Sequence, residues 1–75
     1  MLDQRKYRPR YRKFLTRLRD ARRQAGLTQE EAARRLGRHQ AFLSKCESGE
    51  RRVDFVELLV LAELYGVNIS FFEES

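Results

Sequence analysis

Cysteine, histidine and proline each occur once in this 75-residue sequence, and tryptophan does not occur at all. The single cysteine, Cys46, excludes a disulfide within one chain and a cysteine-rich zinc site. The lone histidine, His39, has no further metal ligands at a suitable spacing, so we expect no metal site. Sparse cysteine also suits a reducing compartment, and we expect the protein to be cytoplasmic.

Catalytic and membrane-spanning patterns are equally scarce. One histidine, one cysteine and no phosphate-cradling glycine loop leave no basis for a nucleophilic or nucleotide-dependent site. We therefore expect neither enzymatic activity nor a cofactor. No apolar run approaches the roughly 20 residues that span a bilayer, and the charged N-terminus is unlike a signal peptide, so we expect no membrane partner.

Charge is abundant and unevenly distributed. Sixteen Lys and Arg residues against eleven Asp and Glu residues give a net charge of +5. Residues 1–25 hold ten basic and two acidic residues, a net of +8, whereas residues 26–75 hold six basic and nine acidic residues, a net of −3. A basic first third suits a polyanion such as a nucleic-acid backbone, and the acidic remainder argues against indiscriminate coating.

A chain of this length forms one domain with a small core. Residues 1–8 lack an apolar period, so we expect a loose basic arm there and the domain itself over residues 9–75. Pro9 suits the first turn of a helix, where its missing N–H costs nothing. The arm either follows a DNA backbone, lies on an anionic membrane or stays disordered without a partner; the first interpretation agrees best with the motif described next.

Apolar spacing and capping signals predict only helices, over about residues 9–25, 28–36, 40–48, 54–65 and 68–74. Two capping boxes, Thr28 with Glu31 and Asp54 with Glu57, mark the starts of the second and fourth helices. Each of the four glycines ends one of the first four helices. In the fourth helix the expected inward stripe is Leu58, Leu59, Leu61, Ala62 and Tyr65. Because no segment shows strand alternation, the predicted fold is all-α.

The segment 27–50, LTQEEAARRLGRHQAFLSKCESGE, reads as two short helices joined by a tight turn at Gly37. This is the design of a helix-turn-helix unit, whose second helix enters the DNA major groove. Helical spacing predicts an inward orientation for Phe42, Leu43 and Cys46. It leaves outside Gln40, Ala41, Ser44 and Lys45. We interpret Cys46 as a small buried hydrophobe, with a redox sensor as the alternative.

These residues together resemble the phage repressor and Cro family of helix-turn-helix regulators, also called the xenobiotic-response-element family. The resemblance covers about residues 14–74 and rests on LRDARRQAGLTQEEAARRLG, HQAFLSKCESGERR and ELLVLAELYGVN. It implies a compact five-helix bundle, here with a basic N-terminal extension, that binds DNA as a symmetric homodimer. Two features depart from the family pattern: Cys46 replaces a larger aliphatic residue, and the arm is longer than the family minimum.

The resemblance also implies roles for individual residues. Gln29 should contact a phosphate, and Arg22 and Glu47 match a pair that bridges the first and third helices. The base-facing positions are Gln40, Ala41 and Lys45. The full set expected to contact double-stranded DNA is Gln29, Arg38, His39, Gln40, Ala41, Ser44, Lys45, Ser48, Arg51 and Arg52.

Chemistry supports base recognition by three of these residues. The Gln40 amide can bond adenine in bidentate fashion, Lys45 can reach guanine acceptors, and the Ala41 methyl suits a thymine methyl. The plainer alternative is that these side chains only solvate an exposed helix face.

Two adjacent rings near the C-terminus, Phe71 and Phe72, cannot both enter the same core from one helix face. We expect one ring to serve the core and the other to join Ile69 in a dimer interface, which makes Ile69, Phe71 and Phe72 the interface candidates. The competing explanation is burial of both rings by the arm or by Tyr65.

The sequence therefore predicts a small prokaryotic transcription regulator that binds a palindromic operator as a homodimer and represses or activates. One alternative is a controller protein of a restriction–modification system. Another is the antitoxin of a toxin–antitoxin pair, whose main partner is a toxin protein. A third is an interaction module that has lost DNA binding, which the polar third helix and basic first third argue against.

Overall fold

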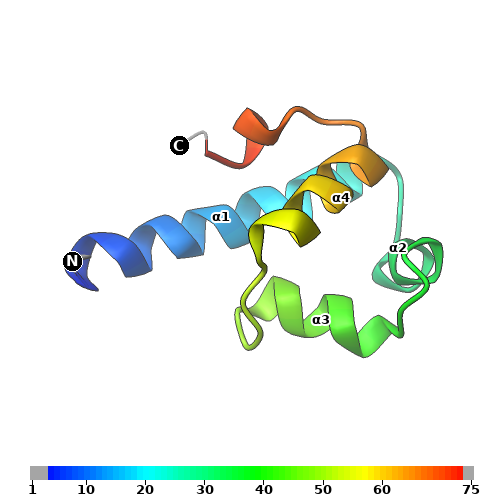
Figure 1. The fold of residues 1–75 in the computed structure, drawn as a ribbon, viewed down its shortest axis with the longest axis horizontal. Coiled ribbons are helices and arrows are strands. Elements are labelled where there is room, and N and C mark those ends of the chain that lie inside the picture. Colours follow the sequence, from blue (N-terminus) through cyan, green and yellow to red (C-terminus); the bar gives the residue numbers. More distant parts are fainter. Residues whose placement is uncertain (1–3, 74–75) are drawn as a thin grey trace.

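The computed structural model describes residues 4–73, which form four α-helices and one 3-10 helix and contain no strand (Figure 1). The elements are α1 (Gln4–Gln24), α2 (Gln29–Arg35), α3 (Gln40–Ser48), α4 (Phe55–Tyr65) and η1 (Ile69–Glu73). The all-α prediction is confirmed. The fifth predicted helix is instead a short 3-10 segment, started by a bond from the Ser70 N–H to the Asn68 side-chain oxygen at 2.9 Å. The 3-10 helix has a tighter geometry than the α-helix and occurs in short segments of this kind rather than in long helices.

Helix α1 is the longest element, and the rest of the domain packs along its C-terminal part, while its N-terminal end projects from the bundle (Figure 1). It contacts α3, α4 and η1, and α2 packs mainly against α3. Helices α2 and α3 therefore form a unit that packs on α1 through α3.

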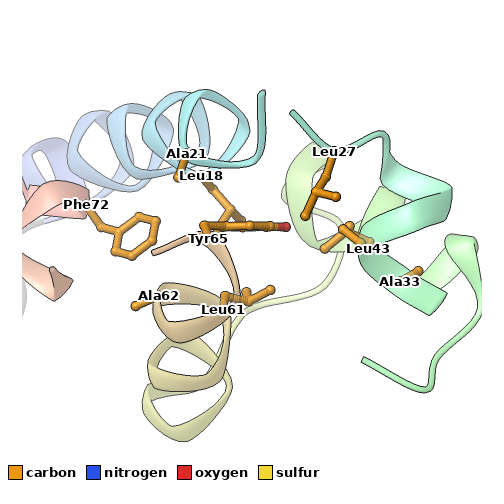
Figure 2. Close-up of a cluster of buried hydrophobic side chains, with 10 residues drawn as sticks. Leu18, Ala21, Leu27, Ala33, Leu43, Leu61, Ala62, Tyr65 and Phe72 are labelled. Atoms are coloured by element: carbon orange, nitrogen blue, oxygen red, sulfur yellow. The ribbon is translucent and has the colours of Figure 1, made fainter. Parts of the chain in front are cut away.

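A single cluster of buried side chains joins these elements (Figure 2). It contains Leu18, Ala21, Leu27, Ala32, Ala33, Leu43, Leu61, Ala62, Tyr65 and Phe72. The two alanines of α2 are at most 1% exposed, and their small side chains allow α3 to approach closely. The Tyr65 ring lies across the centre of the cluster (Figure 2), where burial raises the pKa of its hydroxyl.

The N-terminal extension differs from the expected loose arm. Within residues 1–8, the part from Gln4 onward is the first stretch of α1, and Pro9 lies inside the helix rather than at its start. Proline there lacks one helical N–H donor, but its fixed φ fits a helix. Residues 1–3 lie outside the described part of the chain.

Aromatic contacts hold this first part of α1 against the domain. The rings of Tyr7 and Tyr11, one turn apart, stack with centroids 6.2 Å apart. The Arg52 guanidinium lies over both rings, 4.8 and 5.0 Å from their centroids, and donates a hydrogen bond to the Tyr7 hydroxyl. The Val53 N–H donates to the Tyr11 hydroxyl at 3.2 Å. This stretch of α1 is helical although it has no apolar period, because contacts with Arg52, far along the chain, stabilise it.

Helix α4 buries a narrower stripe than the sequence predicted. Leu61, Ala62 and Tyr65 are buried and Leu58 is partly buried, as expected, but the prediction for Leu59 is wrong because its side chain is 43% exposed. Phe55, Val56 and Val60 are 67%, 66% and 49% exposed. We call the exposed residues Phe55, Val56, Leu59 and Val60 the α4 outer face. In so small a domain the neighbours of α4 cover only one of its sides.

Two glycines with a positive φ offer a matched test of the packing around α3. Gly49, which ends α3, has φ 87°, and a Cβ there would lie 2.9 Å from the Cδ1 of buried Leu15. Gly66, which ends α4, has φ 69° and open space around it. We expect Gly66→Ala to lower the free energy of unfolding by about 1 kcal/mol, from left-handed strain alone. Gly49→Ala should cost more, since Leu15 must also move. Urea denaturation measures both; equal losses would show that Leu15 shifts without cost.

Candidate nucleic-acid interface

Local hydrogen bonds fix the start of α2. The Thr28 hydroxyl accepts from the Glu31 N–H at 3.1 Å, and the Glu31 carboxylate accepts from the Thr28 N–H at 2.9 Å. The predicted capping box is thus confirmed, and these bonds lower the pKa of Glu31. The helix then ends at Leu36, and Gly37, with φ 71°, turns the chain toward α3.

Helix α3 spans Gln40–Ser48, as predicted, with His39 as its N-cap residue. Leu43 and Cys46 are completely buried, and Phe42 is partly buried. Burial also raises the pKa of the Cys46 thiol, which agrees with a packing role. The exposed residues of α3 are Gln40, Ala41, Ser44, Lys45 and Ser48. The predicted division of the helix into inward and outward faces is therefore confirmed.

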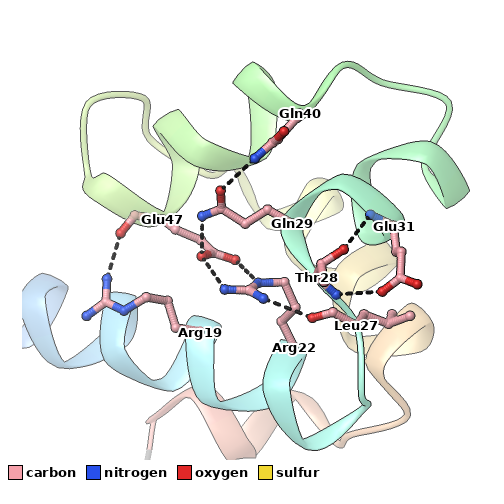
Figure 3. Close-up of polar contacts among 8 residues, drawn as sticks. All are labelled: Arg19, Arg22, Leu27, Thr28, Gln29, Glu31, Gln40 and Glu47. Carbon is pink, nitrogen blue, oxygen red and sulfur yellow. Dashed lines mark hydrogen bonds and ion pairs between the residues drawn. The ribbon is translucent and has the colours of Figure 1, made fainter.

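A buried ion pair attaches α3 to α1 (Figure 3). The Arg22 Nε and Nη2 atoms donate to the two Glu47 carboxylate oxygens, at 2.7 and 3.1 Å. Arg22 is 8% exposed and Glu47 is 2% exposed. Arg22 also donates to the Leu27 carbonyl at 2.9 Å, and its bond with Glu47 raises its pKa. The pair implied by the family resemblance is confirmed.

This pair continues outward to the exposed face of α3. The Gln29 amide donates to the Glu47 Oε1 atom at 2.9 Å, and its carbonyl accepts from the Gln40 amide at 3.4 Å (Figure 3). On the other side, Arg19 donates to the Glu47 backbone carbonyl at 2.9 Å. The sequence did not indicate the contacts of Gln29 and Arg19 with Glu47, because no local pattern links residues so far apart in the chain.

The remaining predicted DNA contacts divide into two groups. Arg38 and His39 are exposed at the turn before α3, with the Arg38 guanidinium 4.0 Å from the Phe42 ring centroid. Arg51 instead makes a bidentate pair with Glu57, at 2.9 and 2.7 Å. Arg52 is exposed and lies on the tyrosines of α1. The structure thus gathers on the α2–α3 surface Gln29, Arg38, His39, Gln40, Ala41, Ser44, Lys45 and Ser48.

The Arg51–Glu57 pair also belongs to the start of α4. Glu57 accepts from the Asp54 N–H at 3.0 Å, and Asp54 accepts from the Glu57 N–H at 2.8 Å, so the second predicted capping box is confirmed. The bond from Arg51 lowers the pKa of Glu57 and raises that of Arg51. Arg51 therefore has a structural partner in addition to any partner on DNA.

The C-terminal aromatic residues have distinct surroundings. Phe72 is 4% exposed and meets Phe14 edge-on, with centroids 6.0 Å apart, so it is the ring that serves the core. Phe71 is partly buried, and the Arg17 guanidinium lies 3.9 Å from its ring centroid. Arg17 also donates to the Phe71 carbonyl at 2.8 Å. With Ile69 partly buried as well, η1 leaves little apolar surface open to a partner.

The α4 outer face is an apolar surface that the sequence-based prediction did not include. A signal for it was present, since α4 reads FVELLVLAELY and is apolar on nearly every side. Such a helix is normally buried all round, so in a small domain it indicates either a partner or an exposed apolar patch.

We expect the buried pair to show strong energetic coupling. Removing one partner of a buried ion pair leaves the other charge uncompensated, which costs about 3–5 kcal/mol. Arg22→Ala and Glu47→Ala should each lower stability by that order, and the double variant should lose much less than the sum. The Arg51–Glu57 pair, with side chains 38% and 23% exposed, provides a control cycle with a smaller coupling energy. Thermal denaturation of all variants measures both cycles, and a coupling near zero for Arg22 and Glu47 would contradict the bracing role.

Within the described residues, no group of histidine, cysteine and acidic side chains is arranged to hold a metal ion. The same residues include no helix with the length and apolar character needed to cross a bilayer. A search of curated proteins and a search of solved structures found no match. The family model of the helix-turn-helix domain matches residues 14–70, which include α2, α3 and α4 entirely. This chain therefore belongs to the helix-turn-helix family of DNA-binding domains.

Proposed function

We propose that this protein is a transcription regulator of the phage repressor and Cro type that binds a palindromic operator as a homodimer. The observation that carries the proposal is the exposed polar face of α3, held from behind by the buried Arg22–Glu47 pair. A recognition helix must keep a fixed position relative to the groove, because base contacts depend on sub-ångström placement. Promoter occupancy then produces the regulatory effect.

In this mechanism the N-terminal half of α3 enters the major groove. Gln40 offers a donor and an acceptor to adenine, Lys45 offers donors to guanine, and Ala41 offers a methyl group to thymine. The Gln40 bond to Gln29 is long, at 3.4 Å, so little is lost when the amide turns toward a base. Phosphates flank the groove within reach of Arg38, His39, Ser44 and Ser48.

Three further predicted contacts have competing partners within the domain. Gln29 keeps its amide on Glu47, so we propose that it positions Gln40 in addition to approaching a phosphate. Arg52 is exposed, but its guanidinium lies on the Tyr7 and Tyr11 rings, so a phosphate would compete with this contact. Arg51 would share its charge between Glu57 and a phosphate, and we rank it last among the proposed DNA contacts.

The basic N-terminal part of α1 is proposed to follow the DNA backbone. It is helical and docked through Tyr7, so its backbone has a defined direction relative to α3. Arg8, Arg12 and Lys13 are exposed along it. Phosphate contacts add affinity without reading sequence.

Specificity should depend on Gln40 and Lys45. In site selection from random DNA, we expect Gln40→Ala and Lys45→Ala each to relax the preference at particular base pairs. The loss should be roughly 1–3 kcal/mol per half-site, because a good bidentate base contact is worth that much. A phosphate contact would instead weaken binding to all sequences about equally. Selection of the parent motif by both variants would show that the recognition face is wrongly assigned.

The basic N-terminal part of α1 should change the affinity for DNA and the salt dependence of binding, but not the DNA motif that the protein selects. We expect Arg5→Gln, Lys6→Gln and Arg8→Gln to reduce the slope of log affinity against log salt by about 0.9 for each phosphate that is no longer neutralised. Substitution is preferable to deletion of residues 1–8, which would remove the stacked Tyr7 ring. Fluorescence anisotropy titrations at several salt concentrations measure the slope, with Arg23→Gln, at the far end of α1, as the control. An unchanged slope would remove the extension from the interface.

A further inference from the structure

The α4 outer face is the largest cluster of exposed apolar side chains among the described residues. Phe55 and Leu59 are four residues apart, as are Val56 and Val60, so the four side chains lie in two adjacent rows along one helix face. A patch of this kind on a small domain indicates an interaction site. None of the four is needed for the core, since at least two-fifths of each is exposed.

An apolar hollow of about 180 Å³ adjoins this face, between α4 and the helix-turn-helix unit. Its apolar walls are Leu36, Phe42, Val53, Val56, Val60 and Leu61. Cys46, Arg38 and Glu57 complete its lining. Because Val56 and Val60 belong to both features, the projecting face and the hollow are one continuous surface.

We propose that a second copy of this chain covers this surface, with the two α4 helices antiparallel about a two-fold axis and Phe55 of each copy in the hollow of the other. A two-fold interface must be self-complementary, and a projecting ring beside an apolar hollow meets that condition. Size agrees, because an apolar cavity of about 150 Å³ holds a benzene ring. This inference rests on the proposed function, in which a palindromic operator is bound by two copies.

The size of the contact sets the strength of the dimer. A helix of 11 residues is about 16 Å long, so α4 against α4 alone buries less than the roughly 800 Å² per partner of a stable interface. The residues at the rim of the hollow must contribute the rest of the buried area. We therefore expect a dimer with micromolar affinity that becomes tighter when both copies occupy one palindrome.

The C-terminal aromatic residues are the alternative dimer interface, and their surroundings support it less well. Phe72 is in the core, and Phe71 is covered on one side by Arg17. Phe71→Ala therefore serves as a comparison variant in the test.

Analytical ultracentrifugation of the full chain tests the proposal. The parent should show a monomer–dimer equilibrium at micromolar concentration, and Phe55→Ser and Val60→Asp should each weaken it at least tenfold. Phe71→Ala and Ala25→Asp should leave it unchanged; Ala25 is exposed just beyond α1 and takes the same added charge as Val60→Asp. Circular dichroism melts check folding, and if Val60→Asp does not fold, Phe55→Ser decides.

Binding to DNA separates failure of the interface from failure of the proposed function. Phe55→Ser should bind a single half-site as the parent does and lose the extra affinity for the full palindrome. A parent that is monomeric alone and on the palindrome would overturn the interface, as would a dimer weakened by Phe71→Ala but not by Phe55→Ser. In the first case the surface belongs to a different protein, such as a toxin. Absence of sequence-specific binding to any DNA would instead overturn the proposed function.

Discussion

The ion pair between Arg22 and Glu47 is the contact on which the arrangement of α1, α2 and α3 depends. An unpaired charge in an apolar interior costs several kcal/mol, so both groups are stable there only together. The Glu47 carboxylate accepts two bonds from Arg22 and one from Gln29, which brings all three helices to one point. Any displacement of α3 along α1 would leave one of these charges uncompensated. The pair therefore favours one position of α3 over slightly displaced positions, whatever its net effect on stability.

The same constraint reaches the surface through Gln29. Its amide is held by Glu47, and its carbonyl in turn accepts from Gln40 at the start of α3. Because the side chain that would meet a base is oriented by one that is already fixed, less conformational freedom remains to be lost on binding DNA. The basic part of α1 is fixed in a comparable way, by the contacts of Tyr7 with Tyr11 and Arg52. Both parts of the proposed DNA interface, the start of α3 and the basic part of α1, are thus held in place by contacts with the rest of the helical bundle.

Helix α4 shows how the small size of the domain shapes its surface. With a core drawn from few residues, α4 can bury only the side that carries Leu61, Ala62 and Tyr65. Its other side carries exposed phenylalanine, valine and leucine. A chain that acted as a monomer would gain if polar residues replaced them. A second copy that covers this side would extend the apolar core and would set the spacing of two recognition helices on one operator.

The sequence by itself determined the features that depend on short-range contacts. The capping boxes of Thr28 and Asp54 and the bounds of α3 were predictable because each involves residues three or four apart. The inward position of Leu43 and Cys46 followed from helical period, whereas the Arg22–Glu47 pair was predictable only through resemblance to a family. Tertiary structure decided two further features of the domain.

The first is the helical state of the stretch around Tyr7 at the N-terminal end of α1, where Arg52, 45 residues further along the chain, stacks on the Tyr7 ring. The second is the side of α4 that is buried, which depends on where α1 and η1 lie. An apolar side chain gains the same free energy on whichever side it is buried, so Leu59 and Leu61 look alike in the sequence. Only the packing of distant segments places Leu61 in the core and leaves Leu59 on the surface.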